Sequence, residues 1–268
     1  MGIINVTPDS FSDAGRFASV DAAVRHGEHL VRSGATMIDI GGESTRPGSQ
    51  PVAEALELDR VVPVIERLSN VVEVPISVDT TKAAVAVAAL SAGASIVNDV
   101  SGAQRDDKML EAVVRHDAGL IVMHMQGVPA TMQSAPSYID VVSEVIAYLQ
   151  GRVTAARSAG VRPDAIIADP GIGFGKTLEH NLELLASLER IVDVIDAPIL
   201  IGASRKGFIG SILDGAPVEA RDDATAATSV LSFMRGVAIV RVHNVEASFA
   251  AARMLEAVFS ATQQGALM

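Results

Sequence analysis

Polar side chains that could recognise a flat heterocycle follow short apolar runs of the sequence. Asp79 ends ISVD, Asn98 lies in SIVND and Asp169 ends IIAD, while Lys206 belongs to GASRKGF. A carboxylate accepts two parallel N–H bonds from an amidine-like ring edge, an amide both donates and accepts, and a lysine reaches a ring carbonyl or nitrogen. Because a charge beside apolar residues is costly to bury unless it is paired or binds a ligand, we expect these four residues to share one ligand pocket.

Two other roles are open to polar residues in these positions. Some could cap the following helix or anchor a loop, and we expect that role above all for Asp39, which precedes the turn GGEST. The acids could also bind a metal. The predicted strand ends lack the His-rich ligand cluster typical of zinc, so a cage built from protein ligands alone is not expected.

Two further segments carry charge or glycine. Arg241 and His243 are two residues apart in RVH, so on a strand both point to one face and could form an anion site. Pairing of Arg241 with one of the many acids is the alternative, and the two roles are compatible. The segment DPGIGFGKT matches neither a phosphate loop nor a dinucleotide fingerprint, and we expect its glycines to allow close approach of the backbone to a flat ligand.

Eight apolar runs alternate with amphipathic stretches, which indicates repeated strand–helix units. The expected strands are Gly2–Val6, Met37–Ile40, Pro75–Asp79, Ser95–Asn98, Gly119–His124, Ala165–Asp169, Pro198–Gly202 and Val237–Val242. The 268 residues give about 33 per unit, which fits an α/β fold of the (β/α)8 TIM-barrel type, with its site at the carboxyl ends of the strands. An open doubly wound sheet is less favoured, because the first turn lacks a dinucleotide fingerprint. We predict one domain over residues 1–268.

Composition excludes several classes of protein. The chain has no cysteine, which removes disulfides, thiolate metal sites and a cysteine nucleophile. Its net charge of −11 argues against a general nucleic-acid binder, whose footprint is basic. No stretch of about 18 uncharged apolar residues predicts a membrane span, and the first residues do not resemble a signal peptide. We therefore expect a cytoplasmic protein that acts on small molecules.

Eight segments, in order and spacing, resemble the motifs of the bacterial dihydropteroate synthases. They are MGIINVTPDSFSDAG, IDIGGESTRPG, ISVDT, IVNDVSG, VMHMQGVPATMQ, DPGIGFGKT, IGASRK and RVHNV. The resemblance extends from Met1 to about Ala257. It implies a homodimeric transferase of folate biosynthesis, the target of sulfonamides. Such an enzyme joins (7,8-dihydropterin-6-yl)methyl diphosphate to 4-aminobenzoate with the help of Mg²⁺.

The resemblance also implies a role for individual residues. The expected pterin-pocket residues are Asp79, Asn98, Met123, Asp169, Gly202 and Lys206. The expected diphosphate-binding residues are Asn5, Thr45, Arg46, Arg241 and His243, with Asn5 also at the metal. The residues expected around the aminobenzoate are Phe11, Thr45, Pro47, Phe174 and Ser204. The expected catalytic residues are Asp13, Asp79, Asp169 and Lys206, with Asp13 and Arg46 in loops that help close the site.

The sequence departs from the family pattern at two positions, and two other functions stay open. Ala14 replaces a glycine of the first loop, and Asn244 replaces the usual aspartate after RVH.

Pterin-dependent methyltransferases that serve corrinoid proteins share a barrel and a similar pterin pocket, but they would not require SRK or RVH. A non-catalytic pterin-binding homologue would be signalled by loss of the first-loop aspartate or of Lys206, and both residues are present.

Overall fold

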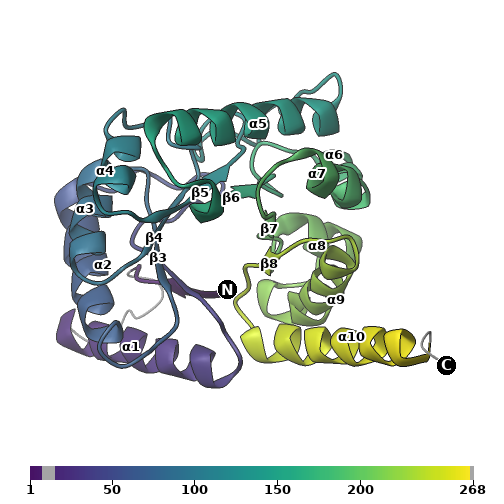
Figure 1. Cartoon of the computed structure of the whole chain (residues 1–268), viewed down its shortest axis with the longest axis horizontal. Helices are drawn as coiled ribbons and strands as arrows, with labels where there is room; N and C mark the ends of the chain where they lie inside the picture. Colours follow the sequence, from purple (N-terminus) through teal and green to yellow (C-terminus); the bar gives the residue numbers. More distant parts are fainter. Residues whose placement is uncertain (8–15, 266–268) are drawn as a thin grey trace.

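The eight strands surround a common centre, and the helices lie outside them (Figure 1). A computed structural model describes residues 1–7 and 16–265. Its strands are β1 (Gly2–Asn5), β2 (Ile38–Gly41), β3 (Ile76–Asp79), β4 (Ile96–Asp99), β5 (Gly119–Met123), β6 (Ile166–Asp169), β7 (Leu200–Ile201) and β8 (Ile239–Val240). Each strand overlaps one of the predicted apolar runs and extends at most one residue beyond it. Short runs rich in isoleucine and valine suit buried parallel strands.

The strands close into a barrel. Strands β1 to β6 form one parallel sheet in sequence order, and β7 pairs with β8 in parallel. Isolated bridges from Ala168 to Ile199 and from Gly2 to Val242 join the two sheets at both seams. The backbone N–H of Val242 donates to Met1 O at 2.9 Å, which secures the second seam. The predicted (β/α)8 TIM barrel is confirmed.

The helices that cover the barrel follow the strands in order. They are α1 (Arg16–Arg32), α2 (Glu54–Leu68), α3 (Ala83–Ser91), α4 (Met109–Arg115), α5 (Val141–Ala159), α6 (Leu178–Ala186), α7 (Leu188–Val194), α8 (Gly207–Ile212), α9 (Asp222–Met234) and α10 (Val245–Gly265). Short 3₁₀ turns occupy η2 (Pro163–Ala165) and η3 (Val218–Arg221). No helix in these described ranges is long and apolar enough to cross a membrane.

Local chemistry explains where two of these helices begin and end. Helix α5 begins after Asp140, whose carboxylate accepts the backbone N–H of Ser143 at 3.0 Å and so caps the helix. It ends at Gly160, whose φ of 105° favours glycine. Helices α6 and α7 are separated at Ser187, whose ψ of 14° departs from helical geometry.

The barrel interior has an apolar floor beneath a polar layer. Its floor is a small cluster that is separate from the main core between strands and helices, formed by Met1, Ile96, Ile121 and Leu200 with Met37, Ile167 and Ile239. Since side chains alternate along a strand, the residue two positions later faces the same way. The side chains above Ile96, Ile167 and Ile239 are therefore Asn98, Asp169 and Arg241.

Candidate active site

One arginine links carboxylates of the neighbouring strands β2 and β3. Arg241 donates from Nε to Asp39 Oδ2 at 2.6 Å and from Nη2 to Asp79 Oδ2 at 3.0 Å. Asn98 Nδ2 donates to the same Asp39 oxygen at 3.2 Å. The structure thus brings three predicted site residues together: Arg241 bonds Asp79 directly and is linked to Asn98 through a fourth residue. The pairing of Arg241 with acids, given as an alternative from the sequence, is confirmed.

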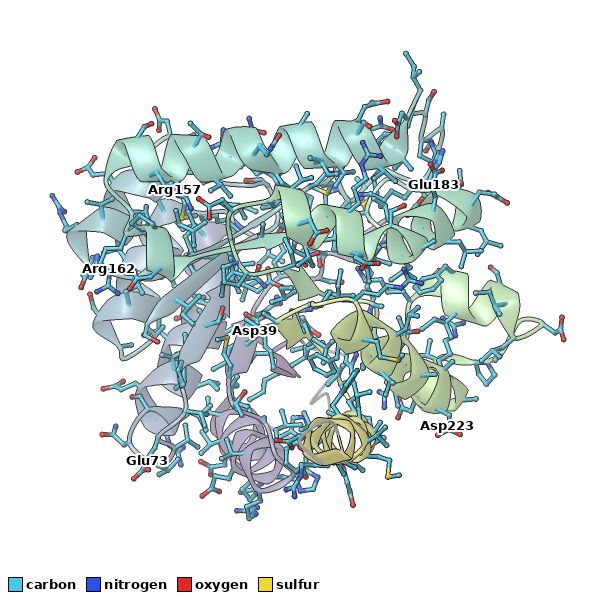
Figure 2. All side chains as sticks on the ribbon, turned by 45° about the vertical axis from the view of Figure 1, so that its right-hand side comes forward. Asp39, Glu73, Arg157, Arg162, Glu183 and Asp223 are labelled. Atoms are coloured by element: carbon cyan, nitrogen blue, oxygen red, sulfur yellow. The ribbon has the colours of Figure 1, made fainter. Side chains whose placement is uncertain are left out.

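That fourth residue, Asp39, was expected to cap a helix or anchor a turn, and this expectation is wrong. Asp39 is fully buried inside the barrel (Figure 2), and its partners are Arg241 and Asn98. Its Oδ1 has no hydrogen-bond partner within the described structure. The signal was available in the sequence, because Asp39 lies two residues after Met37, as Asn98 and Asp169 lie two residues after floor residues.

Burial moves the pKa values of the polar layer toward neutrality. It raises the pKa of Asp79 to about 7, although the charge of Arg241 opposes the rise. It also raises the pKa of Asp169, against the opposing charge of Lys206. The pKa of Lys206 falls to about 7 because burial disfavours its ammonium, while Asp169 opposes that fall. Groups that can gain or lose a proton near neutral pH are typical of active sites.

Lys206 lies between a backbone carbonyl and an aromatic ring. Its Nζ donates to Ile172 O and lies 4.1 Å from the centre of the Phe174 ring, which is within cation–π range. A methyl group at Gly202 would lie 3.8 Å from Asp169 Oδ2, so this glycine borders the polar layer. Met123 is buried, and it lies opposite Asp169 in the pairing of β5 with β6. The six predicted pterin-pocket residues therefore line one region of the barrel.

The rim above β7 and β8 carries positive charge around a neutral histidine. Ser204 Oγ lies 2.9 Å from His243 Nδ1 and accepts the backbone N–H of His243 at 3.1 Å. The pKa of His243 falls to about 3, first through burial and then through the charges of Arg241, Arg205 and Arg46. Asp222, which pairs with Arg205, opposes this fall. An anion at this rim would meet the charge of Arg241.

The remaining predicted residues are less tightly placed. Thr45 is half-buried, and Arg46 and Pro47 are exposed in the loop between β2 and α2. Thr45 forms no side-chain hydrogen bond within residues 1–7 and 16–265. Asn5 is half-buried at the end of β1, and its amide likewise has no hydrogen-bond partner in the described chain. Phe11 and Asp13 lie outside the described residues.

Two glycines of DPGIGFGKT accommodate a neighbouring loop, and the close approach of this segment to a flat ligand stays a prediction. Gly171 and Gly175 have φ values of 68° and 60°, which favour glycine. A methyl group at Gly171 would overlap the carbonyl oxygen of His124, and one at Gly175 would overlap that of Gln126. The loop after β5 therefore packs directly against this segment.

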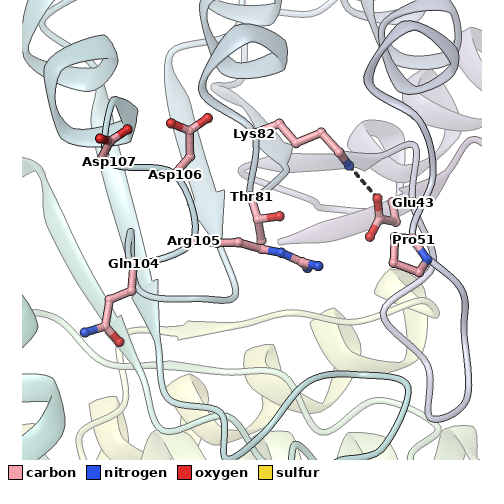
Figure 3. A pocket seen from close by; sticks show the side chains of 8 residues that line it. All are labelled: Glu43, Pro51, Thr81, Lys82, Gln104, Arg105, Asp106 and Asp107. Atoms are coloured by element: carbon pink, nitrogen blue, oxygen red, sulfur yellow. Dashed lines mark hydrogen bonds and ion pairs between the residues drawn. The ribbon is translucent and has the colours of Figure 1, made fainter.

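A separate cavity of about 360 Å³ lies among the loops after β2, β3 and β4 (Figure 3). It is lined by Glu43, Pro51, Thr81, Lys82, Gln104, Arg105, Asp106 and Asp107. Lys82 pairs there with Glu43 at 2.5 Å and with the fully buried Glu57. None of the predicted site residues that the structure describes lines this cavity. We place the chemistry in the polar layer, where buried charges converge and their pKa values are shifted.

Comparisons with known proteins identify the family of the chain. Residues 1–243 match the family described as pterin binding enzyme. A dihydropteroate synthase from Synechocystis sp. is 45% identical over 259 residues, which cover 97% of this chain and 89% of that protein. The chain belongs to the dihydropteroate synthase family. The synthase of Escherichia coli K12 is 44% identical over 263 residues, with 98% of this chain and 92% of the relative covered.

Solved structures of dihydropteroate synthases share the barrel. One from Yersinia pestis, in a sulfonamide drug complex, has a TM-score of 0.91 and 43% identity over 97% of this chain and 94% of its own. One from Xanthomonas albilineans with 4-aminobenzoic acid has a TM-score of 0.90 and 44% identity, covering 96% and 92%. A complex of the Xanthomonas albilineans enzyme with 7,8-dihydropteroate has a TM-score of 0.86 and 41% identity, again covering 96% and 92%.

Proposed function

We propose that this barrel joins (7,8-dihydropterin-6-yl)methyl diphosphate to 4-aminobenzoate, which gives 7,8-dihydropteroate and diphosphate. The 268 residues act as one pterin-binding domain. The observation that carries the proposal is the layer formed by the buried Asp79, Asn98 and Asp169 and the half-buried Lys206, beneath a rim of cations. The acids and the amide suit the N–H-rich edge of a pterin, and the rim suits its diphosphate.

Recognition of the pterin rests on complementary donors and acceptors. Asp169 offers carboxylate oxygens, Asn98 offers an amide and Lys206 offers an ammonium, all above the apolar floor. A flat ring lying on Met123 would be removed from water, and its polar edge would meet these side chains. Burial of the site strengthens such hydrogen bonds because water does not compete for them.

The reaction breaks the bond between the pterin methylene carbon and the diphosphate oxygen. The electron pair leaves with diphosphate, and the positive charge is shared between the methylene and the dihydropterin ring. Asp79 in its carboxylate form, together with Asp169, opposes that charge. The amine nitrogen of 4-aminobenzoate then attacks the methylene and loses a proton. The step needs no protein nucleophile.

Arg241 and His243 serve the leaving group. Nε and Nη2 of Arg241 are held by Asp39 and Asp79, whereas no hydrogen bond from Nη1 occurs in the described residues. That free edge is available to a diphosphate oxygen, and the exposed Arg46 in the loop after β2 would add a second cation. Fixed cations at the position where negative charge develops lower the barrier without reorganisation of water.

Magnesium fits this site as an ion shared with the substrate. Mg²⁺ prefers oxygen ligands and is commonly held by one or two protein groups together with substrate phosphates. The described residues contain no group of three or more His, Asp or Glu placed for a metal, but Asn5 presents an unbonded amide at the end of β1. Asn5 would therefore hold the ion against the diphosphate, where it would offset phosphate charge.

A homodimer would cover exposed apolar side chains on the helices after β7 and β8. The large exposed residues on or beside these helices are Ile212, Leu213, Val218, Leu231, Met234, Phe249, Met254, Val258 and Phe259. Helices α9 and α10 pack side by side (Figure 1). Clustered apolar surface of this kind is typical of protein interfaces. Light scattering should give twice the 27.8 kDa chain mass, and a mass of 27.8 kDa would contradict the dimer.

A direct assay tests the function. The protein is mixed with Mg²⁺, the pterin diphosphate and 4-aminobenzoate, and we expect dihydropteroate and diphosphate to appear in equal amounts. Methyltetrahydrofolate binding with methyl transfer to a corrinoid, and no condensation, would support the methyltransferase instead. Pterin binding without turnover on either substrate set would support a non-catalytic homologue. We place the reaction in the cytoplasm, because a diphosphate ester does not cross membranes unaided.

A further inference from the structure

Lys176 is a buried lysine in the loop between β6 and α6. It is 3% exposed, and its Nζ points back toward the end of β5. The Nζ atom lies 2.9 Å from Gly171 O, 3.0 Å from Phe174 O and 3.0 Å from His124 Nδ1. An ammonium has three N–H donors, which these three acceptors can satisfy, and a fourth acceptor, His124 O, lies at 3.5 Å.

Lys176 forms no ion pair with any described residue of the chain. Burial lowers its pKa to about 7, and the nearby charge of Lys206 adds to that fall, while Asp169 opposes it. A buried ammonium without a carboxylate partner is costly, so its contacts need a reason. The three acceptors favour the charged amine, because a neutral amine would lose one of the three donors.

The contacts of Lys176 belong to a larger arrangement that fixes the backbone from Gly171 to Gly175. Five successive carbonyl oxygens each accept a bond from a side chain. Gly171 O and Phe174 O accept from Lys176, and Ile172 O accepts from Lys206. Gly173 O accepts from Gln133 at 2.6 Å, and Gly175 O accepts from the Tyr138 hydroxyl at 2.8 Å. The loop is thereby held from both sides.

We propose that Lys176 is a positioning residue for the synthase reaction. By fixing the Gly171 and Phe174 carbonyls, it holds the Phe174 ring in the place where Lys206 packs on it, 4.1 Å from the ring centre. Its contact with His124 ties the same loop to the end of β5. Lys176 therefore acts on substrate through Phe174 and Lys206, without touching it. This inference rests on the function proposed above.

A double-mutant cycle tests the proposal. We expect Lys176→Met to lower kcat/KM for 4-aminobenzoate by about tenfold or more in a protein that still folds. In a Phe174→Ala background the same substitution should cost less than about twofold, because contacting residues that act through one another are not additive. Equal losses in both backgrounds, or no loss in the first, would overturn the proposal. A general loss of stability caused by Lys176→Met would lower kcat/KM in both backgrounds.

Two controls keep the outcome interpretable. Lys82→Met removes a different lysine near the barrel mouth, one that pairs with Glu43. Its effect on kcat/KM should add to that of Phe174→Ala, because Lys82 and Phe174 share no contact. Lys176→Gln keeps two N–H donors, and it should lose less activity than Lys176→Met. If the wild-type protein lacks turnover, the proposed function fails. The same double-mutant cycle can then be measured through the Kd of 7,8-dihydropteroate. Coupling in that Kd supports the positioning role, and its absence refutes it.

Discussion

Arg241 Nη2 lies 3.0 Å from Asp79 Oδ2, although the two residues are 162 positions apart in the sequence. The same guanidinium binds Asp39, so one cation serves two buried carboxylates. Removing the cation leaves both charges uncompensated, whereas removing Asp79 leaves Arg241 paired with Asp39. The two residues should therefore differ sharply in their effects on stability, even though both support turnover.

Asp79→Asn should lower kcat at least about 100-fold, as expected when a charge that stabilises the transition state is lost. The amide keeps the size of the side chain but cannot oppose the cation on the pterin methylene. Steady-state formation of dihydropteroate measures the effect. Asp99→Asn is the matched control, because Asp99 is also buried at a strand end but bonds to Ser101, and its loss should be far smaller. Wild-type turnover in Asp79→Asn would refute the assignment.

The raised pKa of Asp79 predicts a pH dependence of stability. In the folded protein its pKa is about 7, whereas in the unfolded chain it returns to about 3.9. The folded state therefore binds the proton more tightly, and the stability gained from Asp79 is complete below about pH 4 and is lost as pH rises through about 7. Urea unfolding of the ligand-free protein should show a steeper fall over this range than Asp79→Asn. Parallel curves would contradict the assignment.

Arg241→Ala should reduce both turnover and stability. We expect kcat to fall at least about 100-fold. The free energy of unfolding should fall by about 3 kcal/mol or more, because two buried carboxylates lose their partner. Adding Asp39→Asn should restore part of the stability without restoring turnover. Urea unfolding and kcat, measured on the same samples, separate the two effects. Recovery of turnover in the double variant would show that Arg241 serves only to neutralise Asp39.

Much of the fold was predictable because the barrel strands are short apolar runs that end in polar residues. The expected strands Pro198–Gly202 and Val237–Val242 shortened to two residues each, since β7 and β8 pair only over Leu200–Ile201 and Ile239–Val240. The apolar pattern of the sequence carries no sign of the break at Ser187 between α6 and α7. Periodicity reports burial, and it does not report a local change of backbone angle.

The site was predictable by residue type but not by pairing. Alternation along a strand indicates which side chains face the interior, and applied to Asp39 it would have placed this residue correctly. Which of the interior acids shares Arg241 depends on contacts between β2, β3 and β8, which no local pattern encodes. The role of Lys176 was likewise hidden, because its partners are backbone carbonyls and a histidine that directly follows β5.

Gly171→Ala should be strongly destabilising. Its methyl group would overlap the carbonyl oxygen of His124, and its φ of 68° is unfavourable for alanine. The left-handed backbone alone costs about 1–2 kcal/mol, and overpacking adds about 1–3 kcal/mol. Gly215→Ala is the matched control, since Gly215 has a φ of 86° but open space around it. Chemical denaturation should therefore show a clearly larger loss for Gly171→Ala, and equal losses would contradict the close packing of these loops.

A crystal structure with bound 7,8-dihydropteroate tests the central claim most directly, because it locates the pterin. We predict that the pterin ring lies above Met123, with its polar edge bonded to Asn98, Asp169 and Lys206, and that the benzoate lies beside Phe174. A pterin found instead in the cavity lined by Glu43, Lys82 and Arg105 would contradict the account.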